Sequence, residues 1–568
     1  IIKANGSIGV TAEAEQLILS GAGSAALTTG NVGMGAGIIV ITDSHRAWAQ
    51  AGRNAVLDAL GQGNGITGNF GKLEVTDSTS GNITYKSGKH GQMTINGILI
   101  GAFGTTNIHA LAVSAGAGST VGAGASSVTT VEAARTQAII NEGARINRES
   151  GRNGGQAAVY VVASGDSVES VSGGSAGISG STGISGCVVV YTGKKYTEAS
   201  IRSGANVFAE KEIVVLAHTD NQLYATAVGV AGSGSTAAGA TVSVIYLKDE
   251  TTASAGGTLE GASITVQAEA DERLVMSVMS AAVSGSTAAG ASVGTIVFKG
   301  ITRAIVLPGV QLTAANGGIK VSAQSNEKVN LTVAGAAGSG SASVAGSFAV
   351  LIMNVTTQSM VQDSNAAAKG SLTAAGSVEI SAADKTEFDL IVGGASFGGS
   401  AAVGAAIGTT IYRNSVTAMI GNNNIVVGKN IRVTAAADRN IRSSAVMAGG
   451  GSASVNGSIL IISVGAATTD QDADKANSNG GSNSSTNASS DAAKMGQSAV
   501  DACYGQKIGA GSSNQYVDEV NNELAGLKYE TSGLVSGYFN PVNVSDKTYA
   551  GKWRQHYSKK WRHSCGSV

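Results

Sequence analysis

The sequence predicts an all-β protein, an elongated β-solenoid resembling a parallel β-helix and built from degenerate repeats with short insertions. The first observation is a strand pattern that recurs at intervals of roughly 51 to 61 residues. The second is the alternation of apolar and polar residues within each copy, which is typical of a strand with one buried face. The third is a composition rich in Gly, Ala, Ser and Val, which favours closely stacked strands.

The composition narrows the functional classes. The 568 residues include 81 Gly and only 2 Pro, and charged residues make up 13% and aromatic residues 4%. The glycine share is about twice, and the charged share about half, that of an average globular protein. The net charge of −1 offers no basic surface for nucleic acid. The three cysteines, Cys187, Cys503 and Cys565, fit no metal-binding spacing.

Each repeat contains an anchor strand of the form apolar-x-apolar-x-Ala. Its five best copies end at alanines that should occupy equivalent, buried, stacked positions: Ala217, Ala268, Ala323, Ala382 and Ala435. Earlier copies end at Ala12, Ala102 and Ala163. Stacking such units would bury a continuous core that no single repeat could form alone. We therefore expect one continuous stack over residues 102–464, with contacts only between neighbouring repeats.

A second pattern follows each anchor. It consists of an apolar segment, a Gly/Ser/Ala run such as 338–346, and a very apolar strand such as 348–352. A third strand carries Thr-x-Ala-x-Ile-like residues, as in 302–305 and 417–420. We expect several strands of about five or six residues in each repeat. The uncharged stretches 274–298 and 329–362 are long enough for transmembrane helices, but their Gly/Ser/Thr-rich centres favour strands.

The predicted repeat array covers residues 1–464, with an insertion at about 48–92 in which 47–60 could form a short helix. Residues 465–490 are an Asn/Ser-rich linker by composition, which we expect to be mobile over 468–490. Residues 491–550 are expected to be irregular or partly helical, with a helix at 491–503, and the repeat pattern is not clearly regained there. The chain begins at Ile1 without an initiator Met, so we interpret it as an internal fragment.

No motif predicts catalysis or cofactor binding. The segment 173–177 matches the nucleophile elbow G-x-S-x-G but lies in a Gly/Ser run with no helix after it. The G-x-G-x-x-G match at 63–68 has no βαβ context. The histidines are scattered and form no ligand pair: His45, His90, His109, His218, His556 and His563.

The one metal candidate is an alternating acidic triplet. Asp470, Asp472 and Asp474 resemble the start of a Ca²⁺-binding EF-hand loop, but Lys475 stands where that loop needs Gly. The alternative interpretation is a solvated linker, so no metal, cofactor or catalytic residue is assigned.

The repeated blocks resemble those of leukotoxin-type filamentous adhesins of anaerobic Gram-negative bacteria, and more loosely filamentous-haemagglutinin-like exoproteins. Residues 343–350 and 376–382 carry the resemblance, which covers about 1–464. It implies a β-helical stalk at the cell surface, associated with the outer membrane or extracellular, exported by a type V route through an outer-membrane secretion pore.

The resulting functional hypothesis is a non-enzymatic adhesin shaft that displays binding regions toward a host-cell or bacterial surface ligand of unknown identity. One alternative is a β-helix polysaccharide-active enzyme, which would need acidic or basic residues clustered in an outer cleft. Another is a pore-forming or cytotoxic exoprotein, which liposome leakage would reveal.

The tail, residues 551–568, is expected to be an out-of-frame translation. Lys552 to Ser567 breaks the composition with Trp553, Trp561, two His and a Cys. One permitted codon choice, read from its second base, encodes Asn-Gly-Gly-Asn-Ile-Thr-Val-Lys-Ser-Gly-Gly-Ile-Leu-Val-Ala. That string resembles residues 81–88 followed by 98–102. The alternative is a basic, aromatic peptide that binds a partner.

Overall fold

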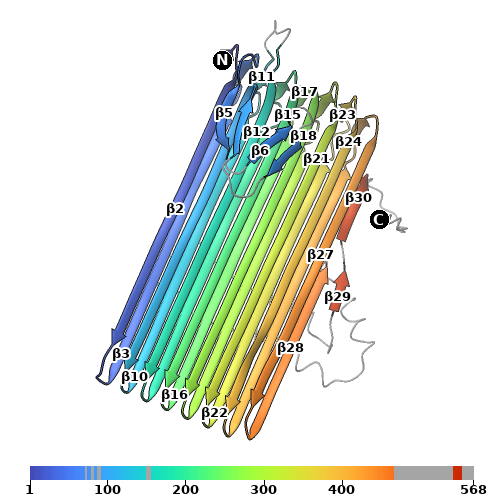
Figure 1. The fold of residues 1–568 in the computed structure, drawn as a ribbon. Helices are drawn as coiled ribbons and strands as arrows, with labels where there is room; N and C mark the ends of the chain where they lie inside the picture. The colour runs from blue at the N-terminus through green and yellow to red at the C-terminus, as the bar shows by residue number, and fades with distance from the viewer. Residues whose placement is uncertain are drawn as a thin grey trace.

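The structure is a computed structural model. It describes residues 1–70, 73–77, 82–85, 91–148, 155–465, 542–545 and 547–552, with side chains omitted for 67–93 and 542–552. The chain winds into a β-solenoid with three parallel sheets, as Figure 1 shows. We name each sheet after its first strand: the β2 sheet, the β3 sheet and the β1 sheet.

Each coil runs along a long strand of the β2 sheet, turns back along a long strand of the β3 sheet, and then crosses a short strand of the β1 sheet. The β2 sheet contains β2 (Ile8–Leu27), β9 (Gly97–Gly118), β12 (Ala158–Ser179), β15 (Glu212–Ser233), β18 (Ser263–Ser284), β21 (Ile319–Ser339), β24 (Val378–Gly398) and β27 (Ile431–Gly450). The β3 sheet contains β3 (Val32–Ala51), β10 (Val121–Ile140), β13 (Thr182–Ile201), β16 (Thr236–Ala255), β19 (Thr287–Val306), β22 (Ala342–Val361), β25 (Ala401–Ile420) and β28 (Ala453–Gly465). The β1 sheet contains β1 (Ile2–Ala4), β4 (Val56–Ala59), β11 (Arg145–Ile146), β14 (Asn206–Phe208), β17 (Thr258–Gly261), β20 (Gln311–Ala314), β23 (Gly370–Ala374) and β26 (Asn424–Val427).

The anchor alanines stack as predicted. Ala217 pairs with Ala268, Ala268 with Ala323, Ala323 with Ala382, and Ala382 with Ala435. The first four are buried, and Ala435, on the outermost strand of its sheet, packs against the same core. The expectation of one continuous stack over 102–464 is therefore confirmed, and 274–298 forms β18 and β19 rather than a helix.

The expected strand length of five or six residues is wrong for the two large sheets. Each coil has two long strands, such as the 22-residue β18 and the 20-residue β19. The Gly/Ser/Ala run does not interrupt the strands, because its residues continue the ladder with the neighbouring coils. Only the turn between β18 and β19, at Gly285 and Ser286, leaves the ladders.

The helix expected at 47–60 is also wrong. Ala47, Ala49 and Ala51 alternate with exposed residues in β3, and β4 follows within the regular coil. The extra residues of the first repeat lie between β4 and β9, where β5 (Ile66–Phe70) pairs antiparallel with β8 (Gly91–Ile95) and β6 (Leu73–Asp77) with β7 (Asn82–Tyr85). Ile95 packs with Leu99 and Tyr160 on the outer face of the β2 sheet. This insertion therefore covers part of that face (Figure 1).

The last coil is completed by residues distant in the sequence. β28 pairs with β25 as far as Tyr412 and ends at Gly465. β29 (Val542–Ser545) then pairs with β28, and β30 (Lys547–Lys552) pairs with β25 from Ser415 to Ile420. The coil pattern is thus regained at 542–552, contrary to the sequence-based expectation. The proposed tail beyond Lys552, the linker 466–490 and the helix at 491–503 lie outside the described residues.

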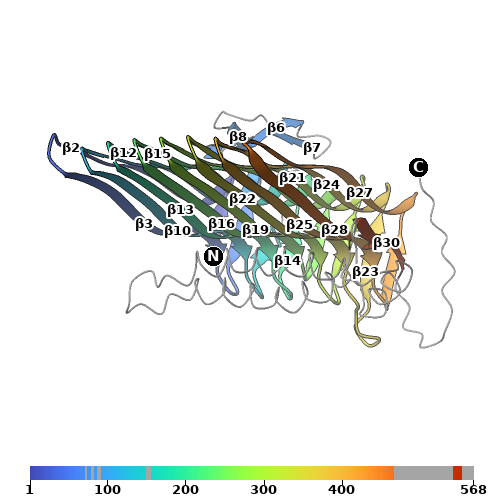
Figure 2. The ribbon, with the colours of Figure 1, turned by 90° about the horizontal axis from the view of Figure 1, so that it is seen from below.

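The two large sheets converge along each coil. At the end where the β1 sheet closes the coil, which we call the broad end, the interior is filled by Ile, Val and Ala side chains. At the end where the turns join the β2 and β3 sheets, which we call the narrow end, the interior residues are mostly Ala, Gly and Ser. Figure 2 shows the sheets from below, with these turns in a row. Between the two ends lies a second apolar core with larger side chains such as Phe298 and Tyr412.

Candidate functional site

A band of polar and charged side chains crosses the interior between the two apolar cores. We call it the interior polar seam and define it by eleven residues: Asp43, His45, Glu132, Glu169, Lys195, Asn221, Asp249, Glu272, Glu327, Asp384 and Asn414. All are buried except His45, which is nearly so. The solenoid register creates the band by stacking polar positions of successive coils. Glu132 stacks on Asp43, Asp249 on Lys195, and Glu327 on Glu272.

Lys195 is the central cation of the seam. Its Nζ lies 2.7 Å from Glu169 Oε1 and 3.4 Å from Glu132 Oε2. It also donates hydrogen bonds to Ser167 and, at 3.1 Å, to Asn221 Oδ1. The Tyr191 hydroxyl donates to Glu132 Oε2 at 2.6 Å. A buried ammonium needs such a set of partners, because an uncompensated charge in the interior is strongly destabilising.

Glu132 and Glu169 face each other from opposite sheets and share one proton. Burial and the charge of Glu132 raise the pKa of Glu169 from 4.5 to about 8. Burial by itself would also raise the pKa of Glu132, but the Lys195 ammonium and the hydrogen bonds from Glu169 and Tyr191 together outweigh burial and lower that pKa to about 2. Near neutral pH the protonated Glu169 therefore donates to the ionised Glu132, and Lys195 balances the single negative charge.

The same arrangement recurs in later coils. Asp249 on β16 faces Glu272 on β18, and burial raises the pKa of Asp249 to about 6 and that of Glu272 well above its usual value. Glu327 pairs with Asp384 of the next coil, and burial together with the Asp384 charge raises the pKa of Glu327 well above its usual value. The Thr386 hydroxyl donates to Glu327 Oε2 at 3.0 Å. In each of these carboxyl pairs, at least one group therefore keeps its proton to a higher pH than an exposed carboxyl group would.

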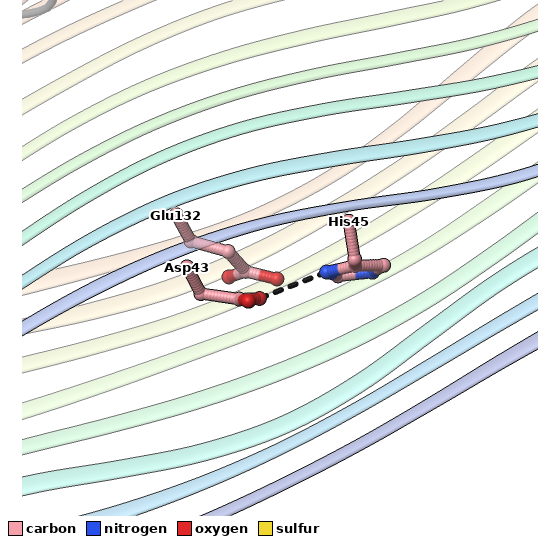
Figure 3. Close-up of side chains that lie close together, drawn as sticks. All are labelled: Asp43, His45 and Glu132. Atoms are coloured by element: carbon pink, nitrogen blue, oxygen red, sulfur yellow. Dashed lines mark hydrogen bonds and ion pairs between the residues drawn. The ribbon is translucent and has the colours of Figure 1, made fainter.

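One group of seam residues has the composition of a metal site. Potential ligand atoms of Asp43, His45 and Glu132 all lie within 4.8 Å of one another. Figure 3 shows the three side chains pointing toward one another. His45 Nδ1 lies 2.8 Å from Asp43 Oδ2, and His45 Nε2 lies 3.0 Å from the Thr106 hydroxyl. The adjoining cavity, lined by His45, Glu132 and Lys195, has room for about one water, about 10 Å³.

These three residues already have protein partners. His45 bonds to Asp43, while Glu132 is held by Tyr191, Lys195 and the proton of Glu169. A divalent cation here would also lie close to the Lys195 ammonium, which opposes binding. The group therefore belongs to a hydrogen-bonded structural network, and the adjoining cavity is too small for an organic substrate.

A second buried ionic group lies on the outer face of the β2 sheet. His218 Nε2 is 3.8 Å from Asp166 Oδ1, and His218 Nδ1 is 3.9 Å from Glu269 Oε2. All three residues belong to neighbouring coils, and His218 is almost fully buried. The group neighbours the apolar cluster that Ile95 of the insertion helps to form, because Val162 and Leu216 of that cluster lie two residues before Ser164 and His218, on the same face of β12 and β15.

Within the part of the chain that the structure describes, the sequence motifs are not assembled into a site. The elbow-like segment 173–177 lies within β12 and makes no turn, and the glycines at 63 and 65 precede the β5 hairpin strand in a loop. Cys187 is buried in β13. Asp470, Asp472 and Asp474 lie outside the described residues, as do Cys503, Cys565, His556 and His563.

Sequence reasoning missed the interior polar seam. The signal that could have located it is the Asp43-x-His45 pair, which period-2 alternation places on one face of a strand. Carrying the repeat register one coil further places Glu132 directly on Asp43. The alignment of repeats was built on alanine anchors in the β2 sheet, so it did not extend to these positions in the β3 sheet.

No family model matches this sequence, and searches of curated proteins and of solved structures returned no match. Within the described residues, the structure has no helix that is long and apolar enough to span a membrane.

Proposed function

We propose that this chain is a non-enzymatic, filament-forming shaft of a surface or secreted adhesin, which holds binding regions away from a bacterial cell. The observation that carries the proposal is the in-register stack of long strands from Ile8 to Gly465. Such a stack resists bending because every long strand is bonded to neighbours along about 20 residues. The resemblance of residues 343–350 and 376–382 to filamentous adhesins supports the same function.

The distribution of charged groups favours a shaft over a polysaccharide-active enzyme. A glycosidase needs two carboxyl groups flanking an open cleft that admits a sugar chain. The facing carboxyl pairs of the seam, such as Glu132 with Glu169 and Asp249 with Glu272, are buried between the sheets, where a sugar chain cannot reach them. Export through an outer-membrane pore by a type V route belongs to the same proposal and rests on the resemblance alone.

Adhesion of coated beads tests the proposal. Beads carrying the full chain should attach to epithelial cells or to whole Gram-negative bacteria more often than beads carrying the Ala268→Arg variant, whose fold is destabilised. Equal attachment of the two bead types to both targets would contradict an adhesin. Release of reducing ends from polygalacturonate or dextran, or leakage from liposomes, would favour the enzyme or the pore-forming alternative.

A further inference from the structure

The narrow end of the solenoid lacks charged residues in every coil. In each coil the narrow-end residues lie within a run that contains no Asp, Glu, Lys or Arg, and these runs are 16–42, 91–131, 170–193, 221–247, 274–298, 329–362, 390–412 and 443–465. Each run includes the end of a β2-sheet strand, the turn, and the start of the following β3-sheet strand, and two runs extend further toward the broad end, 91–131 over all of β9 and 329–362 over all of β22. Because the coils are in register, these segments lie side by side and form one uncharged region.

The close approach of the sheets explains only the inward half of this pattern. A Cβ at Gly177 would lie 1.8 Å from the backbone oxygen of Ile184 in the facing sheet, so large inward side chains do not fit. Outward positions have no such limit, and a protein surface ordinarily carries many charged side chains. The absence of charge on both outer faces therefore needs another cause.

Exposed apolar side chains gather at the same end. Among the described residues, all but six of the large apolar side chains that are exposed lie in these uncharged segments. The six exceptions are Ile1, Ile2, Trp48, Ile425, Val427 and Ile431. Met279 is 43% exposed, Val230 44% and Val344 51%. Such a concentration of exposed apolar surface is typical of an interaction site.

The outer face of the β2 sheet also has an apolar hollow at the narrow end. It has a volume of about 430 Å³ and crosses four coils, from Val228 and Val230 on β15 to Ala395 on β24. The hollow arises because the outward side chains shrink from Val228 and Met279 to Ala334 along one row of the register. Its nearly uniform apolar lining suits hydrocarbon better than a polar peptide.

A row of positive charge borders the uncharged region on the β3 sheet. Lys194, Lys248, Lys299 and Arg413 occupy equivalent outward positions, with Asn354 between the last two. On the β2 sheet the nearest charges are mixed and include Arg273 and Asp389. A row of cations beside an apolar surface is complementary to the anionic headgroups of a lipid bilayer.

The dimensions agree with this partner. Leu274–Ser284 of β18 spans about 36 Å at about 3.3 Å per residue, close to the hydrocarbon thickness of about 30 Å. Contact with lipid requires that backbone N–H and C=O groups form hydrogen bonds within the protein. In the six inner coils, each long strand has a neighbour on both sides, and the ladders to these neighbours provide such bonds. Face-to-face contact with a second copy would require an uncharged outer face on only one of the two large sheets. At the narrow end the outer faces of both sheets are uncharged, which such a contact does not explain.

We propose that the narrow end is a lipid-docking surface, which contacts the acyl region of an anionic bilayer with its exposed apolar side chains while the Lys194–Arg413 row meets the headgroups. This inference goes beyond the adhesin shaft and does not depend on it. The partner is a lipid surface, and a second copy of the chain is the competing occupant that the test must distinguish.

Flotation with vesicles tests the proposal. The full chain should float with vesicles of phosphatidylcholine and phosphatidylglycerol, and less with phosphatidylcholine alone. Met279→Glu, at the narrow end, should reduce the bound fraction about tenfold or more, because a carboxylate in hydrocarbon is costly. Val344→Glu, on the other sheet, should act in the same direction. Lys248→Gln combined with Lys299→Gln should weaken binding to the anionic vesicles only.

Met360→Glu is the matched control. Met360 also points outward from a long strand, on β22, but it lies in the half of the coil next to the β1 sheet. This variant should bind like the parent chain, and circular dichroism should show that all variants keep their strands. Failure of the parent chain to float, or equal loss in Met279→Glu and Met360→Glu, would overturn the proposal. It would also be overturned if sedimentation without vesicles showed that Met279→Glu dissociates a dimer of the parent chain.

Discussion

The broad and narrow ends are built from the same strands, but the space between the two large sheets is wide at the broad end and very small at the narrow end. At the broad end the β1 sheet holds the two large sheets apart, and inward positions such as Ile264, Val266 and Ala268 fill the space between them. At the narrow end the sheets nearly touch, and inward positions such as Gly122 and Gly177 have no room for a Cβ. Side-chain volume along one strand therefore follows the separation of the sheets.

The two ends also differ in the charged and polar side chains that lie in or near them. The interior polar seam lies between the two apolar cores, whereas the narrow end carries no charge inside or outside. A charged group can be buried in the seam because facing strands offer partners at several depths, as they do for Lys195. The narrow end offers only backbone and small side chains, so a buried charge there would stay uncompensated.

The largest effect is expected from a charge in the broad-end core. Ala268→Arg places a guanidinium among Ala217, Ala323 and the aliphatic residues around them, with no partner for its charge. We expect a loss of about 3–5 kcal/mol in the free energy of unfolding. Urea denaturation followed by circular dichroism measures it. Ala289→Arg, at an exposed position of β19, is the control and should change stability by about 0.5 kcal/mol or less.

A smaller loss of stability is expected when a single methyl group is added to an inward position at the narrow end. Gly177→Ala would place its Cβ 1.8 Å from the Ile184 oxygen and force the sheets apart locally. The expected cost is about 1–3 kcal/mol, the range typical of overpacked interiors. Gly174→Ala is the matched control, since no atom lies within 4 Å of its Cβ. Equal melting temperatures for the two variants would mean that the sheets do not converge as described.

The seam should make stability depend on pH. The folded-state pKa of Glu169 is raised from 4.5 to about 8, so its contribution is fully present below about pH 4.5 and is lost as the pH rises through 8. Asp249, raised from 3.8 to about 6, acts in the same direction. Glu132, lowered from 4.5 to about 2, contributes stability that is lost as the pH falls through 2.

Stability should therefore be highest near pH 4 to 5 and should fall by about 2 kcal/mol or more toward pH 9. Thermal denaturation across this range measures the change. Glu169→Gln keeps the shape of the side chain but cannot ionise, so the decline above pH 5 should become shallower. A profile that rises steadily from pH 5 to 9 in the parent chain would refute the proton-sharing pairs.

The smallest effect is expected at an exposed ion pair. Arg442 Nε lies 2.7 Å from Asp389 Oδ1 on the outer face of the β2 sheet, and the arginine side chain is 60% exposed. Water screens this attraction, so Arg442→Ala should cost about 0.5 kcal/mol or less. Lys195→Met removes a charge of the same sign from the seam and should cost several times more, about 3 kcal/mol. Similar urea midpoints for the two variants would show that burial does not strengthen the seam.

The parts of the fold that the sequence predicted correctly are those that local patterns along the chain encode. The alternation in 264–268 and 319–323 predicted the direction in which side chains point, and the constant spacing predicted that Ala268 and Ala323 stack. Strand length was misjudged because Gly and Ser usually interrupt strands, and the ladder with the next coil is not visible in one repeat. The helix at 47–60 was misjudged for the same reason, since the partners of Ala47 and Ala49 in β10 are distant in the sequence.

By itself, the sequence determined the all-β class, the repeat, its stacking and the inward or outward direction of residues in the anchor strands, because these depend on period-2 alternation and on spacing along the chain. Only the tertiary structure decided how far apart the sheets stand at each depth, and therefore which polar residues meet. Glu132 and Glu169 come from different sheets, and Glu272 belongs to a later coil, so their shared protons depend on distances across the interior. Those distances arise from the packing of all three sheets together, which no local pattern encodes.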